Sequence, residues 1–157
     1  MIRRPVIGRC GRSWSDGHGI IPPMHEVVLA ALVREGRVLL VHRSPNRHAY
    51  PDVWDLPGGH IEPGETELTA LTREMHEELG VQITTDSAIH LCRLDAGSGE
   101  ESVRLSAWIV GEWEGTPTNV APDEHDEIRW FQPEELPPLA HELMGPALAE
   151  VMRGARA

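Results

Sequence analysis

Two short apolar runs near the start of the chain are separated by a turn sequence and predict a β-hairpin. Residues 27–33 and 38–41 are rich in Val and Leu, and Arg34-Glu35-Gly36-Arg37 lies between them. Apolar runs of roughly four to eight residues on either side of a glycine-containing turn are typical of paired strands. A further short strand is predicted over residues 53–56, where Pro57-Gly58-Gly59 ends it.

After this glycine-rich stretch the apolar positions recur with the period of an α-helix. Apolar residues are spaced by three and four over residues 66–79, and Gly80 follows as a stop signal. The pattern predicts an amphipathic helix, with Glu65 at or near its first turn. The apolar positions are Leu68, Leu71, Met75 and Leu79.

The second half of the chain predicts three more strands and a closing helix. Residues 89–94, 103–110 and 127–131 have strand patterns, with regular apolar-polar alternation in the second of them. Residues 141–153 predict an amphipathic helix. Strands on both sides of a central helix, with a second helix at the end, indicate an α/β fold in which a mixed sheet packs between helices.

The chain is long enough for one domain with its own core. It has 157 residues, too few for two ordinary domains. Residues 1–23 are rich in Gly, Arg and Ser and show no sustained periodicity, so we expect a loosely ordered N-terminal arm. Residues 24–157 are then expected to form the folded domain.

The charge balance and the cysteine content exclude several classes of function. The net charge is −11, so a nucleic-acid polymer is an unfavourable partner. Cys10 and Cys92 form neither a disulfide framework nor a zinc motif. The N-terminal residues lack the apolar run of a signal peptide, and no stretch of about 18 apolar residues could span a membrane. We therefore expect a cytoplasmic protein without a membrane partner.

Three glutamates of the predicted helix lie close together on its surface. At 100° per residue, Glu77 and Glu78 lie roughly −60° and +40° from Glu74, so the three carboxylates share an arc of about 100°. Like charges this close are costly unless a cation lies among them, and hard oxygen ligands select Mg²⁺ or Mn²⁺. The same spacing also occurs on solvated helix faces, so the flanking residues decide between the two interpretations.

The flanking residues make the segment similar to the Nudix box. The pattern G-x5-E-x7-R-E-U-x-E-E-x-G-U, with U an apolar residue, is matched at every specified position. The matching residues are Gly59, Glu65, Arg73, Glu74, Met75, Glu77, Glu78, Gly80 and Val81. This resemblance implies a Nudix-type α/β/α sandwich and hydrolysis of a diphosphate linkage in a small nucleoside-diphosphate-linked substrate. It also implies Mg²⁺ as the cofactor, with Mn²⁺ as an alternative.

The resemblance also suggests roles for the box glutamates. Glu74, Glu77 and Glu78 are expected to hold the metal, and the Gly59 carbonyl is an additional candidate ligand. Related enzymes often supply a further ligand or the base from the loop before the last strand, where Glu124 is the preferred candidate. A carboxylate beside the metal can take the proton of the attacking water. The expected catalytic residues are therefore Glu74, Glu77 and Glu124, with Glu74 as the first candidate for the base.

Four further residues are candidates for supporting roles. Arg73 points about 100° away from Glu74 around the helix, so it is expected to brace Glu65 rather than bind metal. Arg43 is a candidate for binding substrate phosphates, and Trp108 for stacking on a base. An ordinary surface loop is the competing interpretation for Arg43.

The leading functional hypothesis is a MutT-like nucleoside triphosphate pyrophosphatase, with oxidised purine nucleotides such as 8-oxo-dGTP among the expected substrates. An ADP-ribose or nucleotide-sugar pyrophosphatase is the alternative within the same chemistry. Isopentenyl diphosphate isomerase shares the fold but needs a cysteine near the strand before the box, where neither Cys10 nor Cys92 lies. A catalytically inactive nucleotide-binding module would commonly lack box glutamates. Many relatives form dimers, so a homodimer is the assembly that the resemblance suggests.

Overall fold

The computed structural model describes residues 25–154, so the predicted arm over residues 1–23 lies outside the described residues. The described chain forms one seven-stranded mixed sheet and a separate two-stranded sheet. The strands of the large sheet are β1 (His25–Arg34), β2 (Arg37–Arg43), β3 (Trp54–Asp55), β4 (Gly58–His60), β6 (Ile89–Ala96), β7 (Val103–Val110) and β9 (His125–Phe131).

Strand β1 is the centre of the large sheet. The order is β3-β2-β1-β7-β6, with β4 paired to β1 and β9 paired to β2. The predicted hairpin is confirmed, since β1 and β2 pair in antiparallel register through Val33 and Val38. The β1–β7 pair is parallel, whereas β4 runs antiparallel to the first half of β1. Because β4 and β2 occupy different halves of the same edge of β1, the sheet divides beside Gly58 and Gly59.

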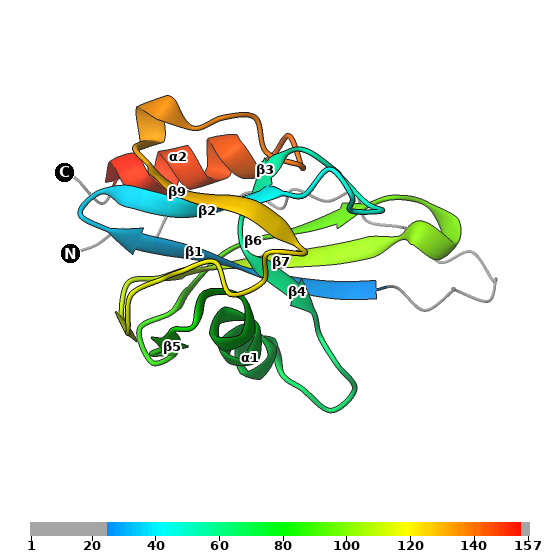
Figure 1. The fold of residues 1–157 in the computed structure, drawn as a ribbon, viewed down its shortest axis with the longest axis horizontal. Helices are drawn as coiled ribbons and strands as arrows, with labels where there is room; N and C mark the ends of the chain where they lie inside the picture. Colours follow the sequence, from blue (N-terminus) through cyan, green and yellow to red (C-terminus); the bar gives the residue numbers. More distant parts are fainter. Residues whose placement is uncertain (1–24, 155–157) are drawn as a thin grey trace.

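Two helices cover opposite faces of this sheet (Figure 1), as the α/β/α prediction requires. Val28, Ala30 and Leu32 of β1 pack in the cluster with helix α1 (Glu67–Leu79). The alternate residues Leu29 and Ala31 pack in the cluster with helix α2 (Met144–Gly154). The main helical contributions to the two clusters are Leu71, Met75 and Leu79 from α1, and Met144, Leu148 and Met152 from α2.

Helix α1 has well-defined signals at both ends. Thr66 is the N-cap, and its side-chain oxygen accepts a hydrogen bond from the backbone N–H of Thr69 at 3.1 Å. Gly80 ends the helix in the left-handed conformation, with φ of 69°. The helix therefore begins one residue later than the sequence predicts, and Glu65 lies just before the cap.

Several short elements were missed by the sequence patterns. Strands β5 (Gln82–Ile83) and β8 (Trp113–Glu114) form the small sheet, and two 3₁₀ turns cover Gly99–Glu101 and Pro133–Glu135. Two-residue strands carry no readable periodicity. In the described part of the chain, neither helix is long and apolar enough to cross a membrane.

Candidate active site

The three box glutamates of α1 differ strongly in exposure. The Glu77 side chain is 56% exposed, Glu74 is 13% exposed, and Glu78 is 4% exposed. The predicted arc of about 100° therefore runs from solvent into the interior of the domain. The helical period places the three residues on one face, but the elements that cover the face decide which carboxylate is buried.

Glu78 is the most deeply placed of these acids. Its Oε2 atom accepts a hydrogen bond from the backbone N–H of Gly58 at 3.1 Å. Burial raises its pKa well above the usual value, and the charge of Glu74 and a hydrogen bond with Glu124 raise it further. Because Glu78 is buried beside Glu74 and Glu124, a nearby cation would favour its ionised form.

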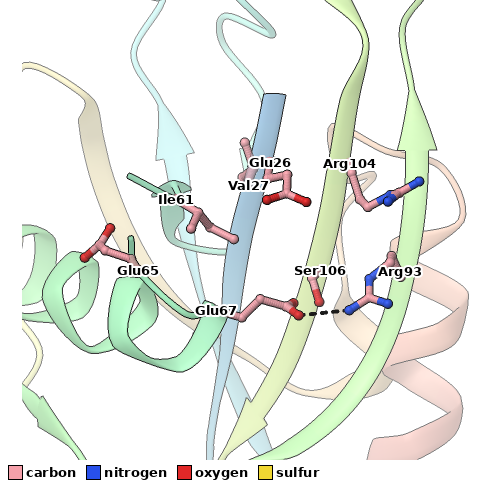
Figure 2. Close-up of a pocket in the computed structure, with 8 residues that line it drawn as sticks. All are labelled: Glu26, Val27, Ile61, Glu65, Glu67, Arg93, Arg104 and Ser106. Atoms are coloured by element: carbon pink, nitrogen blue, oxygen red, sulfur yellow. Dashed lines mark hydrogen bonds and ion pairs between the residues drawn. The ribbon is translucent and has the colours of Figure 1, made fainter. Parts of the chain in front are cut away.

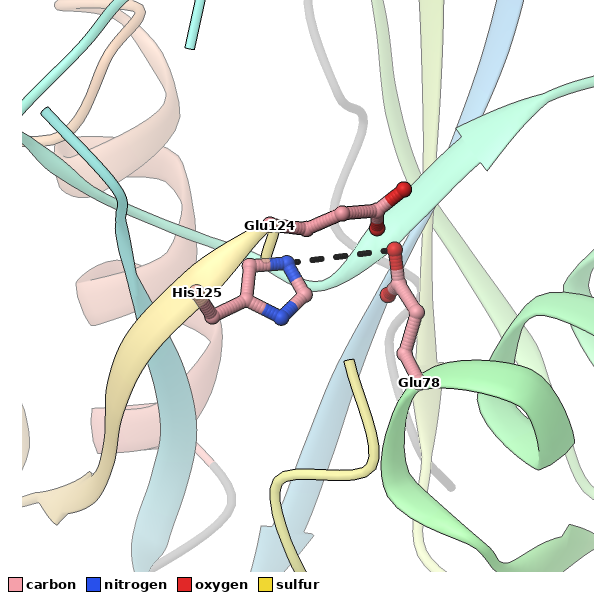
Figure 3. Close-up of side chains that lie close together, drawn as sticks. All are labelled: Glu78, Glu124 and His125. Carbon is pink, nitrogen blue, oxygen red and sulfur yellow. Dashed lines mark ion pairs between the residues drawn. The ribbon is translucent and has the colours of Figure 1, made fainter. Parts of the chain in front are cut away.

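Glu124 and His125 approach Glu78 from the start of β9 (Figure 3). This strand pairs with β2, and the register shifts between His42 and Arg43. The ligand atoms of Glu78, Glu124 and His125 all lie within 4.8 Å of one another, and these three residues are called the acidic cluster below. Residues far apart in the sequence thus meet where α1 faces the beginning of β9.

His125 was not singled out from the sequence, although it directly follows Glu124. The residue is 3% exposed, and its Nε2 lies 3.8 Å from Glu78 Oε1. Burial lowers its pKa to about 4, so the ring is neutral near pH 7. Neighbouring Asn119 donates a hydrogen bond to the His125 carbonyl oxygen at 2.7 Å, which holds the backbone at this point.

Gly59 leaves room for the carboxylate of Glu74. A Cβ atom placed on Gly59 would lie 2.5 Å from both Cδ and Oε1 of Glu74. Any side chain at this position would therefore displace the Glu74 carboxylate. Burial raises the pKa of Glu74, and the hydrogen bond from Arg73 opposes this effect. The carboxylate lies between the backbone of β4 and the Arg73 guanidinium.

Arg73 connects the loop before α1 to the acids on the helix. It donates to both oxygens of Glu65, with Nε to Oε2 at 2.9 Å and Nη2 to Oε1 at 2.8 Å. Its Nη1 atom also donates to Glu74 at 2.9 Å and to Glu77 at 3.2 Å. The hydrogen bonds from Arg73 lower the pKa of Glu65 to about 2. One planar cation thus fixes the position of three carboxylates.

The predicted phosphate-binding residue Arg43 contacts the loop that follows β2. Its guanidinium donates to the carbonyl oxygens of Ala49 at 2.7 Å and Tyr50 at 2.9 Å. The adjacent Arg47 lies nearer the acidic cluster, with Nη1 3.5 Å from Glu124 Oε1. The structure therefore shows Arg43 organising this loop, and a direct role in substrate binding stays a prediction.

Trp108 lies on the α1 face of β7, beside the beginning of the helix. Its indole N–H donates to Glu67 at 3.4 Å, and its ring packs edge-on against His90 with centroids 5.0 Å apart. These contacts do not connect it to the acidic cluster, so the structure does not bring Trp108 together with the other predicted site residues. Base stacking by Trp108 stays a prediction.

Next to Trp108, a polar cavity of about 270 Å³ opens between the start of α1 and the strands β1, β6 and β7 (Figure 2). Glu67 and Arg93 pair across it at 2.8 Å. Glu65 lines the same cavity and also binds Arg73. The cavity therefore borders the Arg73 network, whereas Glu78 and Glu124 do not line it.

Asp55 is a second buried acid that the sequence patterns did not reveal. It is 5% exposed at the end of β3, and its Oδ1 accepts a hydrogen bond from the Leu56 N–H at 2.8 Å. Burial raises its pKa to about 6, although the Leu56 hydrogen bond and the charge of Arg43 act in the opposite direction. A strand of two residues is too short for an apolar-polar alternation that would show which side chain faces the interior.

The acidic cluster fits a divalent cation. Its donors are mainly carboxylate oxygens, which are the ligands that Mg²⁺ and Mn²⁺ prefer. Burial and the neighbouring acids Glu74 and Glu124 raise the pKa of Glu78, so its ionised form is disfavoured without a compensating charge. Arg47 approaches Glu124 only to 3.5 Å. A bound dication would offset the repulsion among these acids.

Comparisons with known proteins identify the family to which the chain belongs. A NUDIX domain model matches residues 23–153. The CTP pyrophosphohydrolase of Escherichia coli (strain K12) is 34% identical over 112 residues, covering 71% of this chain and 78% of the relative. The nucleoside triphosphatase NudI of Salmonella agona is 32% identical over 117 residues, covering 70% and 83%.

Solved structures show the same similarity. The crystal structure of a MutT NUDIX hydrolase from Burkholderia pseudomallei superposes with a TM-score of 0.73 and 32% identity, covering 82% of this chain and 98% of that one. The solution structure of the E. coli ORF135 protein gives a TM-score of 0.69 at 30% identity, covering 86% and 94%. With the complete box, the acidic cluster and the shared fold, the chain belongs to the Nudix family of MutT-like hydrolases.

Proposed function

We propose that this enzyme hydrolyses nucleoside triphosphates to nucleoside monophosphates and pyrophosphate. The observation that carries the proposal is the meeting of Glu78 from α1 with Glu124 at the start of β9, beside Glu74 and the backbone of β4. Relatives at 34% and 32% identity are named for hydrolysis of CTP and of nucleoside triphosphates, which supports this substrate class.

The residues that would hold the divalent cation are Glu74, Glu77, Glu78 and Glu124, with the Gly59 carbonyl as a further oxygen donor. When bound, Mg²⁺ or Mn²⁺ stabilises the charge that develops on phosphate oxygens and makes a water more acidic. Glu78 and Glu124 already lie together, whereas the Glu77 carboxylate is turned toward Arg73 in the described structure.

Glu74 remains the first candidate for the base. It is mostly buried, and Arg73 fixes its carboxylate through the hydrogen bond at 2.9 Å. Burial raises its pKa, and a raised pKa makes a carboxylate a better proton acceptor. In the reaction the water oxygen bonds to phosphorus, the bridging oxygen leaves with its electron pair, and the carboxylate takes the water proton. Glu124 is the alternative, because it reaches the same region from β9.

The nucleobase is the part of the substrate on which the candidates differ. The similarity to a CTP pyrophosphohydrolase favours cytidine nucleotides as the first to test. Oxidised purine nucleotides such as 8-oxo-dGTP follow from the resemblance to MutT, and ADP-ribose and nucleotide sugars are the alternative linkage class. All of these substrates contain the diphosphate that the acidic cluster would act on.

A substrate screen tests the proposal. Purified protein is incubated with CTP, dCTP, the other nucleoside triphosphates, 8-oxo-dGTP, ADP-ribose and nucleotide sugars, with Mg²⁺, Mn²⁺ or EDTA. Pyrophosphate and monophosphate are quantified by chromatography. We expect metal-dependent release of pyrophosphate from a triphosphate, fastest within the cytidine or oxidised-purine group. Turnover restricted to ADP-ribose or sugar nucleotides would contradict the proposal in favour of the alternative.

A further inference from the structure

We propose that His125 adds a nitrogen donor to the metal centre and gives this enzyme a preference for Mn²⁺ over Mg²⁺. The inference rests on the proposed function, because it concerns the cation held by Glu78 and Glu124. It goes beyond the all-oxygen ligand set expected from the Nudix box.

The first argument is the position of the imidazole ring. Its Nε2 lies 3.8 Å from Glu78 Oε1, and the donor atoms of Glu78, Glu124 and His125 lie within 4.8 Å of one another. Adjacent ligands of one octahedral ion with bonds of about 2.1 Å are separated by about 3 Å. The Nε2–Oε1 distance of 3.8 Å is longer than this by less than about 1 Å, so a small side-chain movement would let one ion contact both atoms.

The second argument is that the ring is buried without a hydrogen bond. Within residues 25–154, the His125 Nδ1 atom is fully buried and has no partner, and Nε2 approaches Glu78 at a distance too long for a hydrogen bond. The Nε2 lone pair that faces the carboxylates is therefore not used by a hydrogen bond and is available to a cation when the ring proton is on Nδ1.

The third argument is that the charged neighbours do not offer an alternative partner. Arg43 is engaged with the carbonyl oxygens of Ala49 and Tyr50. Arg47 is paired with the Glu124 carboxylate, with Nη1 3.5 Å from Oε1. Figure 3 shows the His125 ring directed from β9 toward the Glu78 carboxylate. The ring therefore belongs to the group formed with Glu78 and Glu124 and does not pair with a separate charged residue of the described chain.

A nitrogen donor changes which metal binds best. Mg²⁺ prefers oxygen ligands and retains its water, whereas imidazole suits transition metals. Mn²⁺ accepts both carboxylate and imidazole ligands, so a mixed site should bind it more tightly than Mg²⁺. Replacing the imidazole by an amide leaves an oxygen-based site and should reduce this difference.

The test compares metal binding by the full chain in the absence of substrate. Mn²⁺ and Mg²⁺ dissociation constants are measured by calorimetry for wild type, His125→Gln and the control His76→Gln, which changes an exposed histidine on α1. We expect His125→Gln to reduce the Mn²⁺ to Mg²⁺ affinity ratio by about tenfold or more, and His76→Gln to leave it unchanged. An unchanged ratio in a folded His125→Gln protein would overturn the inference.

A spectroscopic measurement on the wild type keeps the test independent of variant folding. Pulsed electron paramagnetic resonance of the Mn²⁺-loaded protein should show the ¹⁴N coupling of a directly bound imidazole. Mn²⁺ bound without this coupling would overturn the inference even if triphosphates are hydrolysed. Conversely, a ¹⁴N signal in a protein that hydrolyses no triphosphate would support the nitrogen donor and contradict the proposed substrate class.

Discussion

Arg73 and Glu65 form a two-point ion pair, with both carboxylate oxygens of Glu65 accepting hydrogen bonds from the guanidinium at 2.8 and 2.9 Å. The same guanidinium donates to Glu74 and Glu77. Arg73→Lys keeps the charge but loses the planar fork, so we expect kcat to fall by roughly 10- to 100-fold. Steady-state kinetics check this expectation. Arg93→Lys changes another arginine–glutamate pair, in which Arg93 of β6 contacts Glu67 of α1, and should leave kcat within about twofold. Equal losses in both variants would contradict the positioning role.

Gly59→Ala should separate activity from folding. The added Cβ would lie 2.5 Å from the Glu74 carboxylate, which is the end of a flexible side chain and can move away. We expect a loss of at least about tenfold in kcat from the displaced carboxylate, with a melting temperature close to that of wild type. Gly111→Ala, where a Cβ meets open space, is the matched control. Wild-type kinetics in Gly59→Ala would show that the position of Glu74 is unimportant.

Asp55 makes the stability of the domain depend on pH. Its pKa rises from 3.8 to about 6 on folding, so its contribution to stability is fully present below about pH 4 and is lost as the pH rises through 6. Asp55→Asn removes this loss, and the free energy of unfolding at pH 7.5 should increase by up to about 3 kcal/mol. Urea unfolding at pH 4 and pH 7.5 measures the change. A gain of equal size at both pH values would contradict ionisation as the cause.

Glu78→Gln should have opposite effects on stability and activity. The replacement removes a buried carboxylate with a strongly raised pKa, so the variant should melt at a higher temperature than wild type in EDTA near pH 7. Saturating Mg²⁺ or Mn²⁺ should raise the melting temperature of wild type, because a ligand at about 100 times its Kd adds about 2.7 kcal/mol. The variant should lose most of this metal-dependent increase. An equal increase in both proteins would place the metal elsewhere.

Glu77→Gln should lower turnover by about 10² or more, because a metal ligand that acts on transition-state charge is lost. The fold should be unaffected, since the side chain is 56% exposed. Glu150→Gln, at an exposed position on α2, provides the control for loss of a surface charge. Near wild-type kcat in Glu77→Gln with saturating metal would remove Glu77 from the ligand set.

The sequence predicted the helices and the longer strands, because their positions follow from local periodicity and capping residues. The apolar spacing and Gly80 located α1 to within one residue, and alternation located β7 over its full length. Helix α2 begins at Met144 rather than at residue 141, because a turn occupies the preceding residues. The small sheet of β5 and β8 is too short for any periodic signal.

The candidate site was predictable where its residues belong to one segment. The box placed Glu74, Glu77 and Glu78 on one helix, but their different exposures depend on β4 and β9, which cover one side of that face. His125 and Asp55 could not be distinguished from other polar residues in the sequence. Their burial results from the pairing of β2 with β9 and β3, which is set by contacts distant in the chain.

The acidic residues of the proposed metal centre come from distant parts of the chain, and this separation affects the order in which the centre forms during folding. Glu78 comes from α1, whereas Glu124 reaches it only when β9 adds to β2, across a long separation in sequence. Loop closure over such a separation is slow compared with formation of a hairpin or a helix. A newly made chain that has formed the first hairpin and α1 therefore still lacks Glu124 and His125 of the proposed metal centre. For the proposed metal centre, we therefore expect full metal affinity only after β9 has paired with β2, and little hydrolase activity before that step.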